Sequence, residues 1–447
     1  MSRSKLLSAA IVALPALALL ASCQLLIGLD GGKPLGTGGT GGSTTASPSS
    51  NASSASASSS GASSSNASSG TGGASSSSMA SSSSTASSSA ASSSSTGAGG
   101  ADGGPCAPCP TVVLLAGGAA EPKVLAGVFG GTTWSPATLA GTTSDGMSIA
   151  VLPATGEAVG LMRAAAPANQ LQYTLWNGAS WSPFASLHGD ATQGEPAIVA
   201  TGAVAHAVYW ENATFLYKHE TFANGAWGIM AQPISPAGAT QAPCGPNPPA
   251  LAPLGAAAAL VFVNGSCGGA TNHLFNTDLS GAAWLASKDL AANPSFSSAL
   301  RPAVAAPASG PELLVAYVDQ GGTQVWFAAR TSGVWSPPQP ITNALTADPL
   351  ALAPLPGSGA VLAYRGTDGK LYTSVYAGAW SPPAGIASVT VNAAPALARG
   401  IGAAKAELAY TDGSGVFHTR LVGTVWTAPV QVAPGTGFSR VALGSGP

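Results

Sequence analysis

The sequence has very little charge. Only 7% of its 447 residues are Asp, Glu, Lys or Arg, against roughly a quarter in an ordinary soluble domain. The 15 basic and 17 acidic residues nearly cancel, so the chain lacks the basic surface that a nucleic-acid backbone requires, and nucleic acid is excluded as a partner. Gly and Pro together make about a fifth of the residues, which excludes a coiled coil or a helical bundle. A long apolar run occurs only at the N-terminus.

The first 22 residues are predicted to be an export signal. Two basic residues precede an apolar segment at residues 6–20 that is short for a membrane-spanning helix. The segment ends in Leu20-Ala21-Ser22-Cys23, which resembles the lipobox of bacterial lipoproteins. That resemblance implies cleavage before Cys23 and a lipid anchor on its thiol, which would hold the protein on a lipid bilayer of the bacterial cell envelope. Gln24 stands where enteric lipoproteins retained in the inner membrane carry Asp, which favours the outer membrane.

Residues 23–104 are predicted to form the lipidated N-terminus and a tether. From Gly31 onward the tether holds little except Gly, Ser, Ala and Thr. Such a segment cannot bury enough apolar surface to offset its ordering entropy, so we expect disorder. Its root-mean-square reach is roughly 45 to 50 Å, which would let the domain at residues 105–447 stand clear of the lipid surface.

A repeat fills the region after residue 104. Gly, one or two residues and then Trp recur seven times, at intervals of 45 to 57 residues, and the Trp is often followed by Ser-Pro. The seven tryptophans are Trp134, Trp181, Trp227, Trp284, Trp335, Trp380 and Trp426. Each unit also carries bulky side chains before its Trp, and five units carry a Pro 31 to 35 residues ahead of it. Four short β-rich segments per unit, separated by Gly or Asp-Gly turns, are typical of a propeller blade.

The number of blades follows from the spacing. The six intervals average about 49 residues, so seven units need about 341 residues, and the region 105–447 offers 343. The first unit holds only three segments, whereas residues 438–443 at the end of the chain look like the missing first strand. The sequence therefore predicts an all-β, seven-bladed propeller, closed by pairing residues 438–443 with the strand that begins near Thr111.

Blade six has the clearest repeat. Residues 363–372 read AYRGTDGKLY and residues 378–382 read GAWSP, and this resembles the repeat of fucose-binding and PLL-like propeller lectins. In that family sugars lie between neighbouring blades, stack on Trp or Tyr, and bind to Arg, Glu or Asp, chemistry that suits a ring with one apolar face. The resemblance implies four ligand-binding residues: Arg365, Asp368, Tyr372 and Trp380.

The recurring aromatic residues also have a purely structural interpretation. A Trp found once per blade is more often a packing residue between sheets, and four of the seven are expected to do nothing else: Trp134, Trp227, Trp284 and Trp426. Asp368-Gly369 and Asp412-Gly413 are hairpin-turn sequences first.

No catalytic or metal-binding motif was found in the sequence. The five histidines, expected in different blades and on strand faces or in solvent, show no metal-ligand spacing: His188, His206, His219, His273 and His418. No cofactor is predicted. Two function classes remain: a module that binds glycans or a surface protein through clefts between blades, or an extracytoplasmic glycoside hydrolase or lyase acting at the axial mouth. The second class would need acids such as Glu195, Glu211, Glu220 and Glu312 to pair in space.

Four cysteines remain besides Cys23. Cys244 and Cys267 lie equally far from a predicted hairpin turn at residues 255–256, so antiparallel pairing would bring them opposite each other and predicts a disulfide. Cys106 and Cys109 frame a Cys-Ala-Pro-Cys sequence where the tether meets the propeller. A local disulfide is the leading interpretation there, with a redox motif or half a metal site as alternatives.

Overall fold

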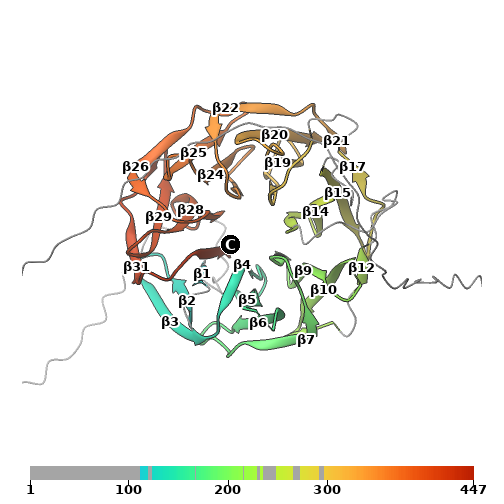
Figure 1. Cartoon of the computed structure of the whole chain (residues 1–447), viewed down its shortest axis with the longest axis vertical. Coiled ribbons are helices and arrows are strands. Elements are labelled where there is room, and N and C mark those ends of the chain that lie inside the picture. Colours follow the sequence, from blue (N-terminus) through green and yellow to red (C-terminus); the bar gives the residue numbers. More distant parts are fainter. Residues whose placement is uncertain are drawn as a thin grey trace, which may run out of the picture. The chain divides into compact units, whose positions relative to one another are not determined.

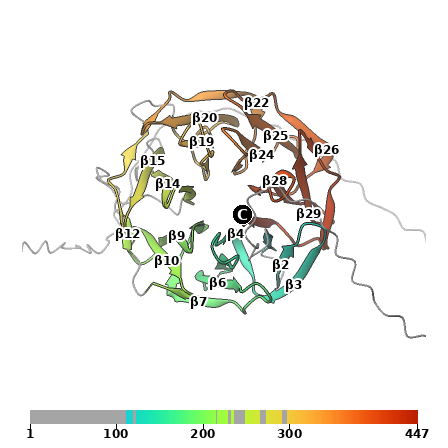
Figure 2. The same ribbon diagram turned by 180° about the vertical axis from the view of Figure 1, so that it is seen from behind.

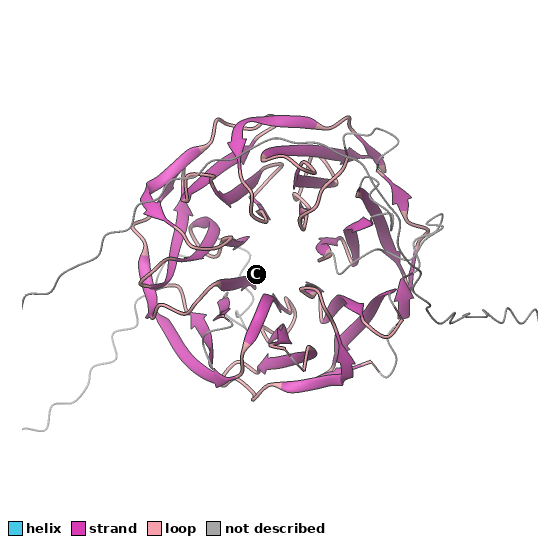
Figure 3. Cartoon of the chain, in the orientation of Figure 1, coloured by secondary structure: helices cyan, strands magenta, loops and turns pink. Residues whose placement is uncertain are grey.

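The computed structural model describes residues 111–118, 123–166, 168–214, 216–228, 232–234, 248–264, 272–290 and 296–446. These residues form seven antiparallel sheets arranged as a ring around one axis (Figure 1). They contain strands and loops but no helix, so none of the described residues forms a helix able to span a membrane (Figure 3). The all-β, seven-bladed propeller is thus confirmed. The predicted signal peptide, the tether and all five cysteines lie outside the described residues.

Each blade places its first strand nearest the axis, and this strand pairs only with the second strand of its blade (Figure 2). We number the blades by their Trp residues in chain order. From blade one to blade seven the inner strands are β32 (Arg440–Ser445), β4 (Thr143–Val151), β8 (Ala197–Thr201), β13 (Ala250–Leu254), β18 (Ala303–Ala305), β23 (Ala351–Pro354) and β27 (Ala396–Arg399).

The second and third strands form the centre of each blade. The second strands are β1 (Val112–Gly117), β5 (Ala158–Ala164), β9 (Val204–Glu211), β14 (Ala257–Asn264), β19 (Leu313–Val318), β24 (Ala360–Arg365) and β28 (Ala404–Thr411). The third strands are β2 (Lys123–Phe129), β6 (Gln170–Trp176), β10 (Leu216–Ala223), β15 (His273–Ser280), β20 (Gln324–Thr331), β25 (Lys370–Tyr376) and β29 (Gly415–Val422).

The outer strand is continuous in some blades and split in others. β3 (Trp134–Ala140) is continuous and includes its Trp, whereas β7 (Ala185–Ala191) and β26 (Ala384–Thr390) begin after a Trp that forms only an isolated bridge to the third strand. The split pairs are β11 (Ala226–Trp227) with β12 (Gln232–Ile234), β16 (Ala283–Trp284) with β17 (Lys288–Asp289), β21 (Val334–Trp335) with β22 (Gln339–Leu345), and β30 (Val425–Trp426) with β31 (Val430–Pro434).

The Trp-Ser-Pro sequence has a structural reason. Pro cannot donate to a ladder, and in blades two, five and six the pairing of the outer strand is interrupted at this sequence, whereas in blade one β3 runs through it. The Ser hydroxyl replaces a lost acceptor for the third strand: the Leu175 amide donates to Ser182 Oγ at 2.9 Å, and the Val375 amide donates to Ser381 Oγ at 3.0 Å. The motif therefore satisfies backbone donors that the proline would otherwise leave unpaired.

The ring closes by pairing the two ends of the domain. β1 pairs antiparallel with β32 from Val112 opposite Ser445 to Gly117 opposite Arg440. Blade one thereby gains the inner strand that its own sequence lacks. The predicted closure is confirmed, and it leaves neither of these strands as an exposed edge.

The core lies between blades. One bulky residue per second strand, in six blades, is at most 2% exposed. The six are Met162, Tyr209, Phe262, Tyr317, Tyr364 and Tyr410. Apolar clusters join residues from two adjacent blades, such as Val325 of blade five with Leu362 of blade six. The blades therefore hold one another through buried apolar surface, and a cleft between two blades has a rigid floor.

The predicted hairpin turn in blade four is present. Leu254 pairs with Ala257, which leaves residues 255 and 256 as the turn, and Gly255 adopts a φ of +61° that favours glycine. The two cysteines expected to face each other beyond this hairpin are outside the described residues, so their disulfide stays a prediction.

Candidate functional site

The recurring Trp packs on the preceding blade. In each blade, one residue of the third strand pairs with the Trp of that same blade. In six clefts, the Trp of the next blade contacts the residue that lies three positions before this one on the third strand. The contacted residues differ in chemistry: Tyr173, His219, Asn276, Phe327, Thr373 and, for Trp134, His418. Trp181 packs on an apolar cluster that includes Ala126. The Trp is therefore a constant inter-blade packing residue, and its partner is the variable that gives each cleft its chemistry.

Most of these indoles have an unmet hydrogen-bond donor. Trp335 Nε1 donates to Asn276 Oδ1 at 3.4 Å, and Trp426 Nε1 donates to Thr373 Oγ1 at 3.2 Å. The other five bury Nε1 with no acceptor among the described residues: Trp134, Trp181, Trp227, Trp284 and Trp380. A buried donor without a partner is costly, so a ligand oxygen that reaches it would gain a hydrogen bond.

The cleft between blades seven and one, here the 7/1 cleft, combines such an indole with charged groups. In Figure 1, β29 and β31 of blade seven lie next to β2 and β3 of blade one, and residues of these four strands line the cleft. A cavity of about 440 Å³ lies there. Phe129 and Trp134 have ring centroids 5.4 Å apart, and the His418 ring lies 5.0 Å from each. The Arg420 guanidinium lies 5.1 Å from the Phe129 ring centroid, within the range of a cation–π contact.

A buried carboxylate holds the polar residues of the 7/1 cleft in place. Glu407 is fully buried and accepts hydrogen bonds from Arg420 Nε and Nη2 at 3.0 to 3.1 Å, and His418 Nε2 lies 3.0 Å from it. Burial alone would raise the pKa of Glu407, but the hydrogen bonds from His418, Arg420 and the Ile401 amide outweigh it and keep the pKa below its ordinary value. The carboxylate is therefore ionised and orients both side chains.

Arg420 keeps donor capacity for a ligand. Its Nη2 also donates to the Ile401 carbonyl at 2.8 Å, whereas Nη1 has only a 3.4 Å contact with the Gly131 carbonyl. The side chain is 21% exposed. The 7/1 cleft therefore offers aromatic faces and one fixed guanidinium edge within a single cavity, and the Trp134 Nε1 donor lies buried in its wall without an acceptor among the described residues.

The cleft between blades three and four, here the 3/4 cleft, holds a pair of histidines. His206 Nδ1 lies 3.1 Å from His219 Nε2, and His206 Nε2 lies 3.0 Å from Thr201 Oγ1. His219 contacts Trp284 at 5.3 Å. Burial lowers the pKa of His206, and burial together with the His206 charge lowers the pKa of His219 to about 4. The expectation that these two histidines lie in different blades was wrong, because β9 and β10 belong to one blade and their register brings the two side chains together. Both lie on strands, which was one of the two expected environments, but they are buried and not in solvent.

The cleft between blades four and five is filled by ion pairs that join the two blades. Arg330 is 4% exposed and donates to both Asp278 oxygens at 2.8 and 2.9 Å, to Asn276 Oδ1 at 2.9 Å and to Glu312 at 3.1 Å. Trp335 Nε1 is satisfied by the same Asn276. With these groups already partnered, this arrangement stabilises the contact between blades and leaves little for a ligand.

The four acids considered for a hydrolase do not pair with one another among the described residues. Glu195 pairs with Arg301, Glu211 with Lys218, and Glu312 with Arg330. The Tyr209 hydroxyl lies between Asp190 Oδ2 and Glu220 Oε1, the latter at 2.8 Å, and its single proton is donated to one of the two carboxylates at a time. That tyrosine fills the space between the Asp190 and Glu220 carboxylates, where a glycosidase would hold its sugar.

The four blade-six residues predicted to bind sugar lie at two separate positions along the blade. Arg365 donates to Asp348 Oδ2 and to the Val391 carbonyl, both at 2.8 Å. Tyr372 donates to Asp368 Oδ2 at 3.0 Å and stacks on Tyr364 at 5.8 Å. These groups lie around the turn at residues 366–369, where a Cβ on Gly369 would lie 3.8 Å from Arg365 Nη2.

Trp380 lies toward the other end of β25. It packs on Tyr376 at 5.4 Å and on Phe327 at 5.8 Å. Tyr376 is four residues beyond Tyr372 on the same strand, a rise of about 13 Å. The structure thus gathers Arg365, Asp368 and Tyr372, and it places Trp380 at a separate level of the cleft. Within the described ranges no group of His, Cys, Asp and Glu could hold a metal ion.

Comparison with solved structures finds several similar chains, one of them described as a six-bladed propeller. AofleA from Arthrobotrys oligospora is 12% identical, with 68% of this chain and 89% of that chain covered and a TM-score of 0.45. A six-bladed lectin from Aleuria aurantia is 13% identical, with 73% and 97% covered and a TM-score of 0.42. An α-L-arabinanase from Penicillium chrysogenum is 12% identical, with 55% and 81% covered and a TM-score of 0.40. At these values the similarity supports no inference about ligand or activity. No family model matches the chain, and no characterised protein was found with a similar sequence.

Proposed function

We propose that this propeller is a carbohydrate-binding module and that the 7/1 cleft is its main sugar site. The observation that carries the proposal is the meeting of Trp134, Phe129 and Arg420 around one cavity. Nε1 of Trp134 is buried and has no acceptor among the residues that the structure describes. An aromatic face suits the apolar C–H side of a sugar, and a fixed guanidinium edge suits its hydroxyls.

The charge balance of the cleft favours a neutral sugar. Glu407 neutralises Arg420 and is itself fully buried, so the ligand meets a hydrogen-bond donor with little net charge. The volume of about 440 Å³ is within the range of small-molecule sites and leaves room for one or two sugar rings.

A glycan array followed by titration calorimetry tests the proposal. Methyl α-L-fucoside is the first calorimetric probe, because it is the sugar bound in one Aleuria aurantia lectin structure. Trp134→Phe keeps the apolar ring and removes Nε1, and Arg420→Lys removes the planar fork. Each should weaken binding about tenfold. Trp181→Phe is the matched control, because this Trp has the same place in its repeat and packs near Ala126 instead of His418.

Two results would count against the sugar site. The parent protein could bind no arrayed glycan and no fucoside at millimolar concentration, in which case a surface protein becomes the better partner. Alternatively, Trp134→Phe and Trp181→Phe could bind the sugar equally well, which would place binding outside the 7/1 cleft. Loss on Tyr372→Ala instead would favour the blade-six residues Arg365, Asp368 and Tyr372, which stay a prediction.

We also propose that the module is displayed on the bacterial cell envelope by a lipid on Cys23. The proposal rests on the lipobox-like sequence and on the composition of the tether. Cys23→Ala should leave the precursor unprocessed and shift the protein out of the membrane fraction. Unchanged processing and unchanged membrane partition would remove the anchor.

A further inference from the structure

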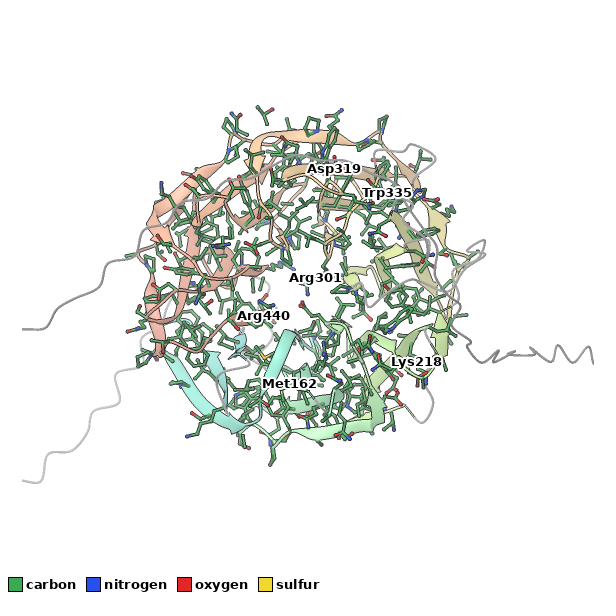
Figure 4. All side chains as sticks on the ribbon, viewed as in Figure 1. Met162, Lys218, Arg301, Asp319, Trp335 and Arg440 are labelled. Carbon is green, nitrogen blue, oxygen red and sulfur yellow. The ribbon has the colours of Figure 1, made fainter. Side chains whose placement is uncertain are left out.

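The axis of the propeller holds a second, chemically different cavity. At the end where the inner strands begin, a mouth of about 390 Å³ is lined by the side chains of Glu195, Arg301, Asp348 and Arg440 together with several prolines and glycines. Figure 4 shows Arg301 and Arg440 at the centre of the ring. Unlike the 7/1 cleft, this mouth contains no aromatic ring among its lining residues.

The channel below the mouth is lined by strand edges. Residues from all seven inner strands border a space of about 180 Å³, and each of these strands pairs on one side only. The unpaired N–H and C=O groups of an edge strand point away from its sheet, here toward the axis. The mouth and the channel share Arg301, Leu350, Pro395 and Val441, so they form one continuous site.

In the mouth, the strong hydrogen-bond donors for an anion are side chains and not backbone N–H groups. Pro248, Pro349 and Pro395 line it, and a proline has no N–H to offer an anion. The strong donors are therefore the guanidinium groups of Arg301 and Arg440.

The two arginines are not equally available. Arg301 reaches across from blade five to Glu195 of blade three and forms an ion pair with it. Glu195 is fixed against the backbone at Gly146, where an added Cβ would lie 1.7 Å from its Cδ. Arg440 donates to the Ser439 carbonyl at 3.0 Å and has no carboxylate partner in the part of the chain that the structure describes. One guanidinium at the axis is therefore free to meet an external anion.

The geometry points to a carboxylate-bearing sugar as the ligand of this axial mouth. Its carboxylate would bind Arg440, with Arg301 as the second donor, and its hydroxyls would face the unpaired backbone groups of the inner strands. A planar guanidinium fork matches a carboxylate through two parallel hydrogen bonds. The site is independent of the 7/1 cleft and would take acidic sugars, whereas that cleft takes neutral ones.

Calorimetric titration with D-glucuronate tests the axial site directly, with D-glucose as the same ring without the charge. We expect glucuronate to bind at least about tenfold more tightly than glucose, and Arg440→Gln to remove that preference. The preference should also fall with added salt, because the mouth is open to solvent. Arg399→Gln is the matched control, since Arg399 is exposed and ends its inner strand, away from the mouth.

A second variant separates this site from the 7/1 cleft. Glu195→Gln should tighten glucuronate binding severalfold by releasing Arg301, and Trp134→Phe should leave it unchanged. The axial site is wrong if glucuronate and glucose bind alike or not at all at about 10 mM, or if Arg440→Gln binds as the parent does. Loss of glucuronate binding on Trp134→Phe would also overturn it, because the ligand would then sit in the 7/1 cleft.

Discussion

The 3/4 cleft and the 7/1 cleft are built on the same backbone positions but carry different chemistry. In each, a third-strand histidine, His219 or His418, contacts the Trp of the next blade. Its second-strand neighbour is His206 in one cleft and Glu407 in the other. Opposite that neighbour in the ladder stands Thr221 in the 3/4 cleft and Arg420 in the 7/1 cleft.

Two changes of residue type, at a second-strand position and at its ladder partner, separate a neutral cleft from a charged one. A buried glutamate needs a cationic partner, and in the 7/1 cleft it has Arg420, with His418 as a further hydrogen-bonding neighbour. A buried histidine can instead shed its charge, and burial in the 3/4 cleft favours that form by lowering both histidine pKa values. The two clefts thus keep the same Trp–His contact, and their chemistry differs at the second-strand residue beside the histidine and at its ladder partner.

The largest expected effect is on the free energy of unfolding and comes from removing the buried carboxylate of Glu407. Glu407→Ala would leave Arg420 without its buried counter-charge and His418 without its hydrogen-bond partner, and the free energy of unfolding should fall by about 3 to 5 kcal/mol. Urea unfolding followed by Trp fluorescence measures it. His206→Ala removes no charge at neutral pH and should cost clearly less, so equal losses from the two variants would contradict the contrast between the clefts.

The next largest effect is the loss of folding stability as the pH falls. The folded-state pKa of His219 is lowered from 6.5 to about 4, so its contribution to stability is present above pH 6.5 and is lost as the pH falls toward 4. The loss should reach about 3 kcal/mol. His219→Gln should flatten the stability profile between pH 6.5 and 4. Because the pKa of Glu407 is lowered from 4.5, the 7/1 cleft should weaken only below that pH. A parent profile already flat over pH 4 to 6.5 would refute the histidine pair.

The smallest expected effect is on the melting temperature and comes from Glu220, a buried acid with fewer hydrogen-bond partners than Glu407. Burial raises the pKa of Glu220, so its contribution to stability is present below pH 4.5 and is lost as the pH rises above that value. Glu220→Gln should therefore slightly raise the melting temperature at pH 7, whereas Glu407→Gln should lower it. Calorimetric melting of both variants decides, and a lower melting temperature for Glu220→Gln would show that Glu220 is as well compensated as Glu407.

The repeat made the fold predictable. Trp spacing gave the blade count, and the incomplete first unit gave the closure that β1 and β32 display. Turn residues such as Gly255 were also readable, because a positive φ restricts the choice of residue. These features are periodic or local, so one sequence is enough to show them.

The 7/1 cleft was not predictable from the same sequence. Its residues come from positions 129 to 134 and 407 to 420, which only the ring closure brings together. The signal that could have found it was a register comparison between repeats, which would have shown that Glu407 and His418 stand where His206 and His219 stand in blade three. Motif matching favoured blade six instead, because its letters follow the lectin repeat most closely.

The most direct test of the sugar site is the indole N–H spectrum of the protein in a ¹H–¹⁵N NMR titration with methyl α-L-fucoside or the best glycan from the array. The account predicts that the Trp134 Nε1–H resonance, assigned by its absence in Trp134→Phe, shifts and saturates as the sugar fills the 7/1 cleft, while the Trp181 resonance stays in place. Binding that leaves the Trp134 resonance unmoved, or that moves Trp380 instead, would contradict it.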